Sequence, residues 1–354
     1  MRSRSRFLKS LVLPFRFPGI AIPRASRVPS VIEISDIRSA AERIRGRVHH
    51  TPLLSASTLG DRAHVRLHLK CENLQKTGSF KPRGALNKVL SLSPAERAKG
   101  LITVSAGNHA QAVAWAARQV EAPCAVVMPA DAPRSKLDAV KGYGAEVILH
   151  PDRATLFDKL HEERLARGAT FIHPFDDPVV LAGAGTVGLE IVDQLPEAQV
   201  VIVPVGGGGL LGGVACAVKA LNPKIRVIAV ELEAGPGLKP ALDAGKPVTV
   251  TRPANTLADG MTPPFVGAIP LELARRFVDE IVTVSEAEII AAMALLITRA
   301  KLYVEGSGAA AAAALLSRRL RLPEGALTVA VVSGGNVDLA RACSALQGGP
   351  EGST

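Results

Sequence analysis

The sequence predicts an α/β protein built on open, mostly parallel sheets that are covered by helices. Its 354 residues are enough for two domains with substantial cores. The hydrophobic fraction of 47% and the charged fraction of 21% are typical of a folded globular chain. From about residue 31 onward, short apolar runs alternate with helical patterns. This order is typical of parallel sheets with both faces buried.

Strands and helices alternate along the chain. The apolar run Leu101–Ser105 predicts a strand, which turns at Gly107 into a helix. The predicted strands are Leu101–Ser105, Ala125–Met128, Glu146–Leu149, Thr170–His173, Val200–Val205, Ile225–Glu231 and Leu327–Val332. The predicted helices are Ala85–Leu92, Ala110–Gln119, Ser135–Gly142, Ala154–Arg167, Thr186–Gln194 and Leu210–Leu221.

Residues 1–30 differ in composition from the rest of the chain. They contain seven basic residues and no acidic one, so the net charge of +10 falls to +3 for the remainder. This distribution argues against nucleic-acid binding, which needs a basic surface on the folded body. We expect residues 1–30 to be a disordered or non-native extension, with an organelle-targeting segment as the alternative.

The remaining composition indicates where the protein resides. No apolar run reaches the roughly 20 residues that a membrane-spanning helix needs. The four cysteines lie far apart, which fits neither a zinc site nor a disulfide framework. We therefore expect reduced thiols, a cytoplasmic location, no membrane association and no nucleic-acid partner.

Lys81 is the first candidate for chemistry. It lies between Phe80 and Pro82 in the segment Lys76-Thr-Gly-Ser-Phe-Lys81-Pro-Arg-Gly-Ala85. A lysine held in a partly apolar turn loses hydration, so the neutral, nucleophilic amine is favoured. Such an amine forms a Schiff base with a carbonyl cofactor.

A second candidate is the run Gly206, Gly207, Gly208 and Gly209, followed by Leu210, between an apolar strand and an apolar helix. Without Cβ atoms, consecutive backbone N–H groups can converge on an anion at the helix N-terminus. The run lacks the lysine of a nucleotide P-loop and the spacing of a dinucleotide fingerprint. A single phosphate monoester, as in pyridoxal phosphate, suits it better.

A third candidate is the substrate loop formed by Ser105, Ala106, Gly107, Asn108 and His109, where a strand gives way to a helix. Its N–H groups and the Ser105 hydroxyl can hold a substrate carboxylate. The alternative is plain helix capping by serine or asparagine. We favour a structural role for His109 over that of a catalytic base.

Together these segments resemble the fold-type-II pyridoxal-phosphate (PLP) enzymes, which include the tryptophan synthase β-chain. They are most similar to threonine/serine dehydratases and serine racemases. The resemblance runs from about Ile32 to Asn336. It includes the motifs Glu72-Asn-Leu-Gln-Lys76, His173-Pro-Phe-Asp-Asp177, Gly185-Thr-Val-Gly-Leu-Glu190, Ala258-Asp-Gly260 and Glu305-Gly-Ser-Gly308.

The resemblance implies a domain organisation. A small substrate-loop domain over roughly 101–174 is inserted in a large PLP-binding domain formed by 31–100 and 175–345, with a tail at 346–354. It also implies a homodimer or homotetramer. Only about eighteen residues follow Asn336, so a regulatory C-terminal domain with isoleucine feedback is not expected.

The resemblance also implies roles for matching residues. Lys81 is the Schiff-base lysine, Asn108 binds the phenolic oxygen of PLP, and Gly206–Leu210 bind its phosphate. Ser333, in Ser333-Gly-Gly-Asn336, faces the ring nitrogen. A neutral hydroxyl there leaves the ring largely unprotonated, which favours rapid β-elimination. Phe80 either packs beside the cofactor ring or fills the core.

Two positions depart from the racemase pattern. Similar racemases carry a serine at the position of Ala106 as a second acid/base, and alanine has no proton to give, so racemisation is expected to be poor. They also carry a divalent-metal site that begins at the position of Glu231 and includes an aspartate where this chain has Gly237. Glu231 is therefore a weak metal candidate, and dependence on a divalent or monovalent cation is not expected.

The sequence thus predicts a PLP-dependent ammonia-lyase that converts L-threonine to 2-oxobutanoate and ammonia, and also L-serine to pyruvate. The partner is a small-molecule amino acid, and the reaction belongs to amino-acid metabolism such as isoleucine biosynthesis. The alternatives are a 3-hydroxyaspartate ammonia-lyase, a serine racemase, or a PLP-binding protein without turnover.

Overall fold

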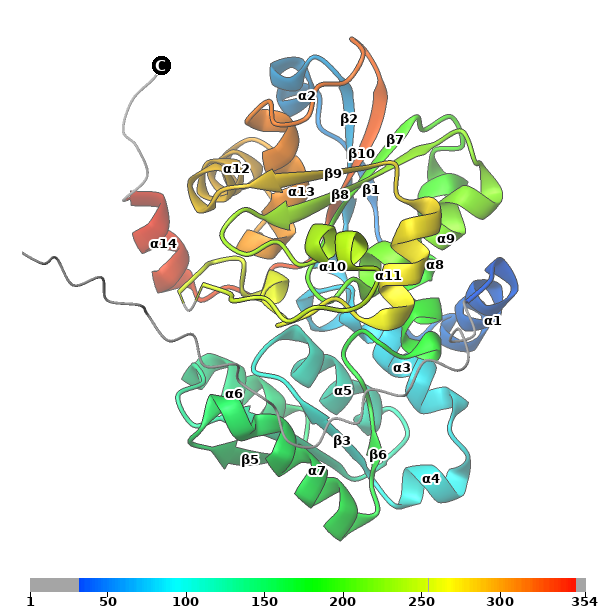
Figure 1. The fold of residues 1–354 in the computed structure, drawn as a ribbon, viewed down its shortest axis with the longest axis vertical. Coiled ribbons are helices and arrows are strands. Elements are labelled where there is room, and N and C mark those ends of the chain that lie inside the picture. Colours follow the sequence, from blue (N-terminus) through cyan, green and yellow to red (C-terminus); the bar gives the residue numbers. More distant parts are fainter. Residues whose placement is uncertain (1–31, 254, 348–354) are drawn as a thin grey trace, which may run out of the picture.

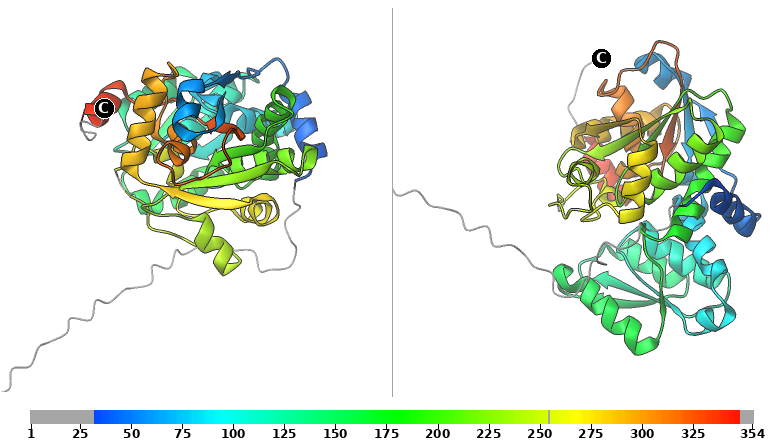
Figure 2. Two further views of the ribbon diagram at one scale, coloured as in Figure 1. Left: turned by 90° about the horizontal axis from the view of Figure 1, so that it is seen from above. Right: turned by 45° about the vertical axis from the view of Figure 1, so that its right-hand side comes forward.

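The computed structural model describes residues 32–253 and 255–347, which form two bodies with one sheet each (Figure 1). The leader predicted for residues 1–30 lies outside the described residues, as do residues 348–354 of the predicted tail. Residues 346–347 belong to the last helix, α14 (Leu339–Gln347). The second view in Figure 2 shows the two bodies stacked along the long axis of the molecule.

The larger sheet has six strands in the order β1-β2-β10-β7-β8-β9. Neighbouring strands are parallel, except that β1 and β2 are antiparallel at one edge. The strand nearest the C-terminus, β10, lies in the middle of the sheet. The strands in this order are Leu53–Ser55, Arg66–Cys71, Leu327–Val332, Val200–Pro204, Arg226–Leu232 and Glu280–Val284.

Helices cover both faces of this sheet because successive side chains of each strand point to opposite faces. Val201 and Val203 of β7 face one helical layer, whereas Val200 and Ile202 face the other. The first layer comprises α8 (Pro178–Gln194), α9 (Gly209–Leu221), α10 (Leu238–Ala244) and α11 (Ala268–Phe277). The second comprises α2 (Ser57–Ala63), α12 (Glu286–Thr298), α13 (Gly306–Leu316) and the edge of α14.

The smaller sheet has four parallel strands in the order β5-β4-β3-β6. These are Glu146–His150, Cys124–Pro129, Leu101–Val104 and Thr170–Phe171. Helices α5 (Asn108–Arg118) and α6 (Arg134–Gly142) cover one face, and α7 (Leu156–Arg167) covers the other. Two open, mostly parallel sheets covered by helices confirm the predicted fold class.

The two bodies contact each other through a shared hydrophobic cluster and an ion pair. In the cluster, helix α3 (Lys81–Ser91) packs with α5, α8 and the end of α1 (Ile34–Ile44). Lys136 of α6 also forms an ion pair with Asp259. The remaining elements are α4 (Pro94–Ala98) and the 3₁₀ turns η1 (Glu72–Leu74), η2 (Lys76–Gly78), η3 (Arg153–Thr155) and η4 (Asp259–Met261).

A buried ion network anchors the first turn of α3. The guanidinium of Arg83 donates to the Glu72 carboxylate at 2.8 Å and to the Glu190 carboxylate at 2.6 Å. Lys70 donates to Glu190 at 2.5 Å and to the Thr51 carbonyl at 2.8 Å. Because Arg83 follows Lys81 by two residues, this network fixes the helix that carries the candidate lysine.

Two expectations from composition concern the membrane and the cysteines. Among the described residues, no helix combines the length and apolar content needed to span a bilayer. All four cysteines lie within the described residues and are free thiols. Cys71 and Cys216 are buried, Cys124 is half-buried and Cys343 is exposed.

Candidate active site

Lys81 begins helix α3 at the junction of the two bodies. Its Nζ donates to the backbone carbonyl of Pro174 at 2.8 Å and lies 5.0 Å from the centre of the Phe80 ring. Burial lowers the pKa of Lys81 to about 8, and the Glu305 carboxylate acts in the opposite direction. The side chain is therefore set up as a nucleophilic amine.

This pKa predicts a pH dependence for cofactor loading. Only the neutral amine attacks an aldehyde, so the rate at which the apoprotein captures PLP is expected to fall below pH 8, by about tenfold per pH unit, and to level off above it. The measurement is the absorbance change after mixing with PLP at a series of pH values. If the rate instead keeps rising until the pH reaches the pKa of an ordinary lysine, about 10.4, Lys81 is not desolvated.

The glycine run forms a cradle between β7 and α9. Gly208 has a φ of +87°, which favours glycine, and the run ends at the N-terminus of α9. A Cβ on Gly207 would overlap the ring of Phe175. The carbonyl of Gly207 accepts a hydrogen bond from the Gly267 N–H at 3.1 Å. Residues 206–209 and Leu210 thus place backbone N–H groups at a helix N-terminus, where an anion is favoured.

The substrate loop lies where β3 gives way to α5. Ser105 Oγ accepts a hydrogen bond from the Gly107 N–H at 3.1 Å, and Ala106 packs against the hydrophobic cluster of the small sheet. Asn108 Nδ2 donates to the Glu305 carboxylate at 2.7 Å. The loop is thereby tied to the larger body.

His109 differs from its neighbours in this loop. Its ring is buried, and Nε2 lies 3.0 Å from the carbonyl of Ile172, the residue that follows β6. Burial, reinforced by the nearby Lys81 charge, lowers the pKa of His109 to about 3. The imidazole is thus neutral; its Nε2 contacts the backbone, whereas its Nδ1 is buried without a hydrogen-bond partner among the described residues.

Ser333 is brought to the lysine by strand β10. Its carbonyl accepts from the Phe80 N–H at 3.1 Å, and Ser79 bridges to Gly334. Ser333 Oγ donates to the Ser307 carbonyl at 3.2 Å. Segments more than two hundred residues apart in sequence therefore meet around Lys81.

Sequence reasoning gave no role to several buried polar groups here. The side-chain oxygens of Thr77, Ser79 and Ser307 are buried and find no hydrogen-bond partner within the described part of the chain. Burial, and secondarily the Asp259 charge, raises the pKa of Glu305, while the hydrogen bond from Asn108 opposes this. The motif that contains Glu305 was visible in the sequence, but a motif alone does not show that its carboxylate is buried and bound by Asn108.

These features fit PLP. The cradle at residues 206–209 suits a phosphate, and Lys81 supplies an amine that a carbonyl cofactor requires. The unpartnered hydroxyls of Thr77, Ser79 and Ser307 are polar groups that a bound polar molecule would satisfy.

Glu231 lies away from this cluster, at the end of β8. Its Oε1 accepts from the N–H groups of Gly237 at 2.6 Å and Leu238 at 2.7 Å, and its Oε2 accepts from Lys239 at 3.2 Å. The carboxylate therefore caps helix α10. Within residues 32–253 and 255–347, no group of three His, Cys, Asp or Glu side chains is arranged to hold a metal ion.

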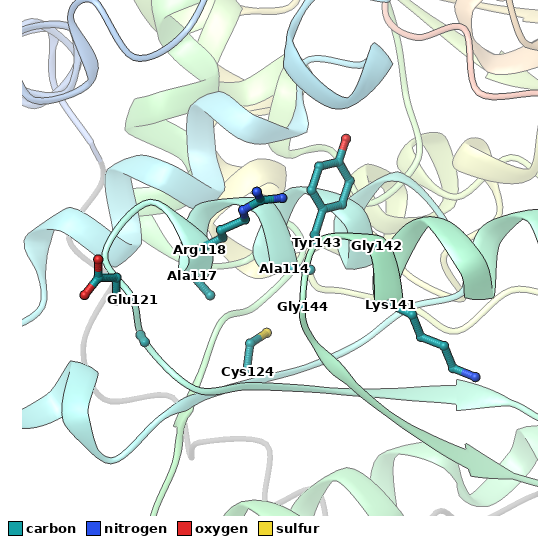
Figure 3. A pocket seen from close by; sticks show the side chains of 10 residues that line it. Ala114, Ala117, Arg118, Glu121, Cys124, Lys141, Gly142, Tyr143 and Gly144 are labelled. Carbon is teal, nitrogen blue, oxygen red and sulfur yellow. The ribbon is translucent and has the colours of Figure 1, made fainter.

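A cavity of about 420 Å³ lies on the small body, at the end of α5 remote from Asn108. Figure 3 shows Arg118, Cys124, Lys141 and Tyr143 among the residues that line it. None of the site residues predicted from the sequence lines this cavity.

The fold, together with the buried lysine, the glycine cradle and the unpartnered hydroxyls, is typical of PLP-dependent enzymes. The family model described as "Pyridoxal-phosphate dependent enzyme" matches residues 44–334. The chain belongs to this family of PLP-dependent enzymes, which shows that PLP is its cofactor.

Within the family, the similarities are specific. The chain is 45% identical over 312 residues to the catabolic L-threonine dehydratase TdcB of Escherichia coli (strain K12), covering 88% of this chain and 94% of that protein. The crystal structure of T.th. threonine deaminase has a TM-score of 0.82 at 43% identity, covering 87% of this chain and 99% of that one. Maize serine racemase has a TM-score of 0.84 at 37% identity, covering 90% and 97%.

Proposed function

We propose that the protein is an L-threonine ammonia-lyase, which releases 2-oxobutanoate and ammonia, and that it also converts L-serine to pyruvate. The names of the relatives that share about 45% identity support this substrate. The observation that carries the proposal is the buried amine of Lys81, which donates to the carbonyl of Pro174, the neighbour of the Phe175 that packs against Gly207 of the cradle. Structural likeness to serine racemase supports racemisation only as the alternative.

We assign the site residues as follows. Bound PLP supplies an aldehyde carbon for the substrate amine and a ring that withdraws electrons from the substrate Cα. The glycine run 206–209, with Leu210, holds the phosphate, Asn108 the phenolic oxygen and Ser333 the ring nitrogen. Phe80 packs beside the ring, and the loop from Ser105 to His109 orients the substrate carboxylate.

Lys81 moves the proton. With PLP bound, the cofactor would hold the substrate amine and make the Cα proton more acidic, and the free Nζ of Lys81 would be the base that removes this proton. With a pKa of about 8, roughly a tenth of the Lys81 amine is neutral at pH 7, far more than for an ordinary lysine. The β-hydroxyl would take up a proton and leave as water, giving an unsaturated amine that tautomerises and takes up one water to yield the oxoacid and ammonia.

A panel assay tests the proposal. The purified protein with PLP is incubated with L-threonine, L-serine and 3-hydroxyaspartate, and oxoacid and ammonia release are measured. We expect the highest kcat/KM with L-threonine. A higher kcat/KM with 3-hydroxyaspartate would identify the protein as a 3-hydroxyaspartate ammonia-lyase instead. Absorbance changes on addition of each amino acid, without release of any product, would indicate a PLP-binding protein without turnover.

Ala106 predicts how the reaction partitions. Its methyl group cannot return a proton to the face of Cα opposite Lys81, so D-serine is expected to be slight or undetectable by chiral chromatography. Ala106→Ser is expected to raise racemisation relative to elimination. Abundant D-serine from the unmodified protein would mean that another residue supplies the second proton.

We further propose that residues 101–174 form a small substrate-loop domain inserted in a large PLP-binding domain formed by 31–100 and 175–345, and that the enzyme works as a cytoplasmic homodimer or homotetramer. The word "catabolic" in the names of several relatives favours threonine breakdown over supply for isoleucine biosynthesis.

A further inference from the structure

Arg252 lies in the loop after α10 and places its guanidinium beside Glu231. Its Nε donates to the Pro263 carbonyl at 2.9 Å, and its Nη1 donates to the Gly235 carbonyl. Its Nη2 is buried and has no partner among the residues that the structure describes. The Glu231 carboxylate offsets part of the cost of desolvating this charge. A half-buried, permanent cation therefore joins two loop segments.

A divalent metal ion does not fit this place, although similar racemases hold one there. Mg²⁺ and Ca²⁺ need six or more oxygen ligands. Both carboxylate oxygens of Glu231 already accept N–H groups, and the Gly235 carbonyl faces Arg252. A Cβ on Gly237 would lie 2.5 Å from Arg252 Nη2, so a side chain at this position would meet a guanidinium.

The segment that Arg252 grips lies directly behind the glycine run. Pro263 Cδ is 3.2 Å from the position that a Cβ of Gly206 would take. A few residues further on, the Gly267 N–H donates to the Gly207 carbonyl at 3.1 Å. Any displacement of residues 263–267 is thus passed to the backbone that forms the cradle.

We infer that Arg252 is a fixed internal cation that takes the place of a metal ion and holds residues 263–267 against the glycine cradle. It is a positioning residue for cofactor binding, and this role rests on the proposed phosphate-binding function of the cradle. Because arginine stays charged at all working pH values, the chain keeps its cofactor without a divalent cation.

The first test measures PLP retention and thermal midpoint in the absence of any amino-acid substrate. In the unmodified holoenzyme, neither is expected to change with EDTA or MgCl₂. Arg252→Met is expected to weaken PLP binding by roughly tenfold, as for one lost charge-assisted hydrogen bond, with Arg252→Lys intermediate. Arg321→Met, at an exposed arginine, is the matched control and is expected to behave as the parent.

The second test asks whether a metal site appears when the guanidinium is removed. In Arg252→Met/Gly237→Asp, MgCl₂ is expected to raise the thermal midpoint and restore PLP retention, and EDTA to reverse both. In Gly237→Asp alone, the new carboxylate is expected to pair with Arg252, leaving no response to MgCl₂. This single variant keeps the inference testable if Arg252→Met does not fold.

Three results would overturn the inference: loss of PLP from the unmodified protein in EDTA, parent-like retention by Arg252→Met, or a MgCl₂ response of Gly237→Asp alone. None of these readouts involves turnover. An enzyme inactive on threonine would refute the proposed substrate while leaving the role of Arg252 open to the same measurements.

Discussion

Replacing Lys81 with alanine is expected to lower the rate of threonine deamination by roughly 10³-fold or more, because the variant would lose both of the proposed roles of Lys81, as the amine that binds PLP and as the base at Cα. Borohydride reduction of the parent should fix the cofactor to the chain, and mass spectrometry should find it on Lys81. In the variant, no fixed cofactor is expected.

Lys99→Ala provides the matched control, because this lysine is exposed and remote from the cradle. It is expected to keep parent kinetics and parent borohydride trapping. Parent-rate turnover by Lys81→Ala would refute the mechanism, whereas loss of both properties in Lys99→Ala would point to a general effect of lysine removal.

Replacing Arg83 with methionine is expected to cause the largest loss of stability, about 3–5 kcal/mol in the free energy of unfolding, because it leaves buried carboxylates unpaired. Glu72 is fully buried and Glu190 is largely so, and both bind Arg83 directly. Urea denaturation monitored by circular dichroism measures the loss.

Two further variants isolate the cause. Arg167 pairs with Glu146 and Glu163 at the surface, so Arg167→Met is expected to cost less than about 1 kcal/mol. Adding Glu72→Gln to Arg83→Met should recover part of the loss, since one buried charge is removed. If both variants lose the same free energy of unfolding, the buried network stabilises the fold no more than a surface ion pair does.

The sequence predicted the strands of the small sheet and the central strands of the large one because these are continuous apolar runs. It missed β2, where charged and apolar residues alternate. The reason is physical: Lys70 is buried in β2 because Glu190 neutralises it, and this partner is 120 residues away. Strand β9, half-buried at the sheet edge, likewise carries no strong apolar run.

Helix starts were predicted late where glycine or proline stands in the first turns. Helix α8 begins at Pro178, eight residues before the predicted Thr186, because Asp177 caps it by accepting from two N–H groups. Gly183 within the helix allows close packing, since a Cβ there would overlap the Arg83 carbonyl. Glycine is usually taken as a sign that a helix ends, but Gly183 lies inside α8 and lets it pack closely against α3.

Sequence motifs were enough to pick out Lys81, the glycine run and the turns at Asn108 and Ser333 as candidates, because each lies in a short, recognisable segment. The side chains that surround these residues could not be predicted from the sequence. Glu305 and the buried hydroxyls of Ser79 and Ser307 meet only through the folded arrangement of β10 and α13. The guanidinium of Arg252 has no sequence signal, because its partners are backbone carbonyls.

The central place of β10 has a consequence for synthesis of the protein. Leu327 pairs with Arg66, a separation of 261 residues (327 − 66), and β10 separates β2 from β7. Until residues 327–332 have been translated, the edges of β2 and β7 stay open, and open strand edges invite intermolecular pairing. A chain that ends before this strand is therefore expected to aggregate, because the edges of β2 and β7 that β10 would cover stay unpaired.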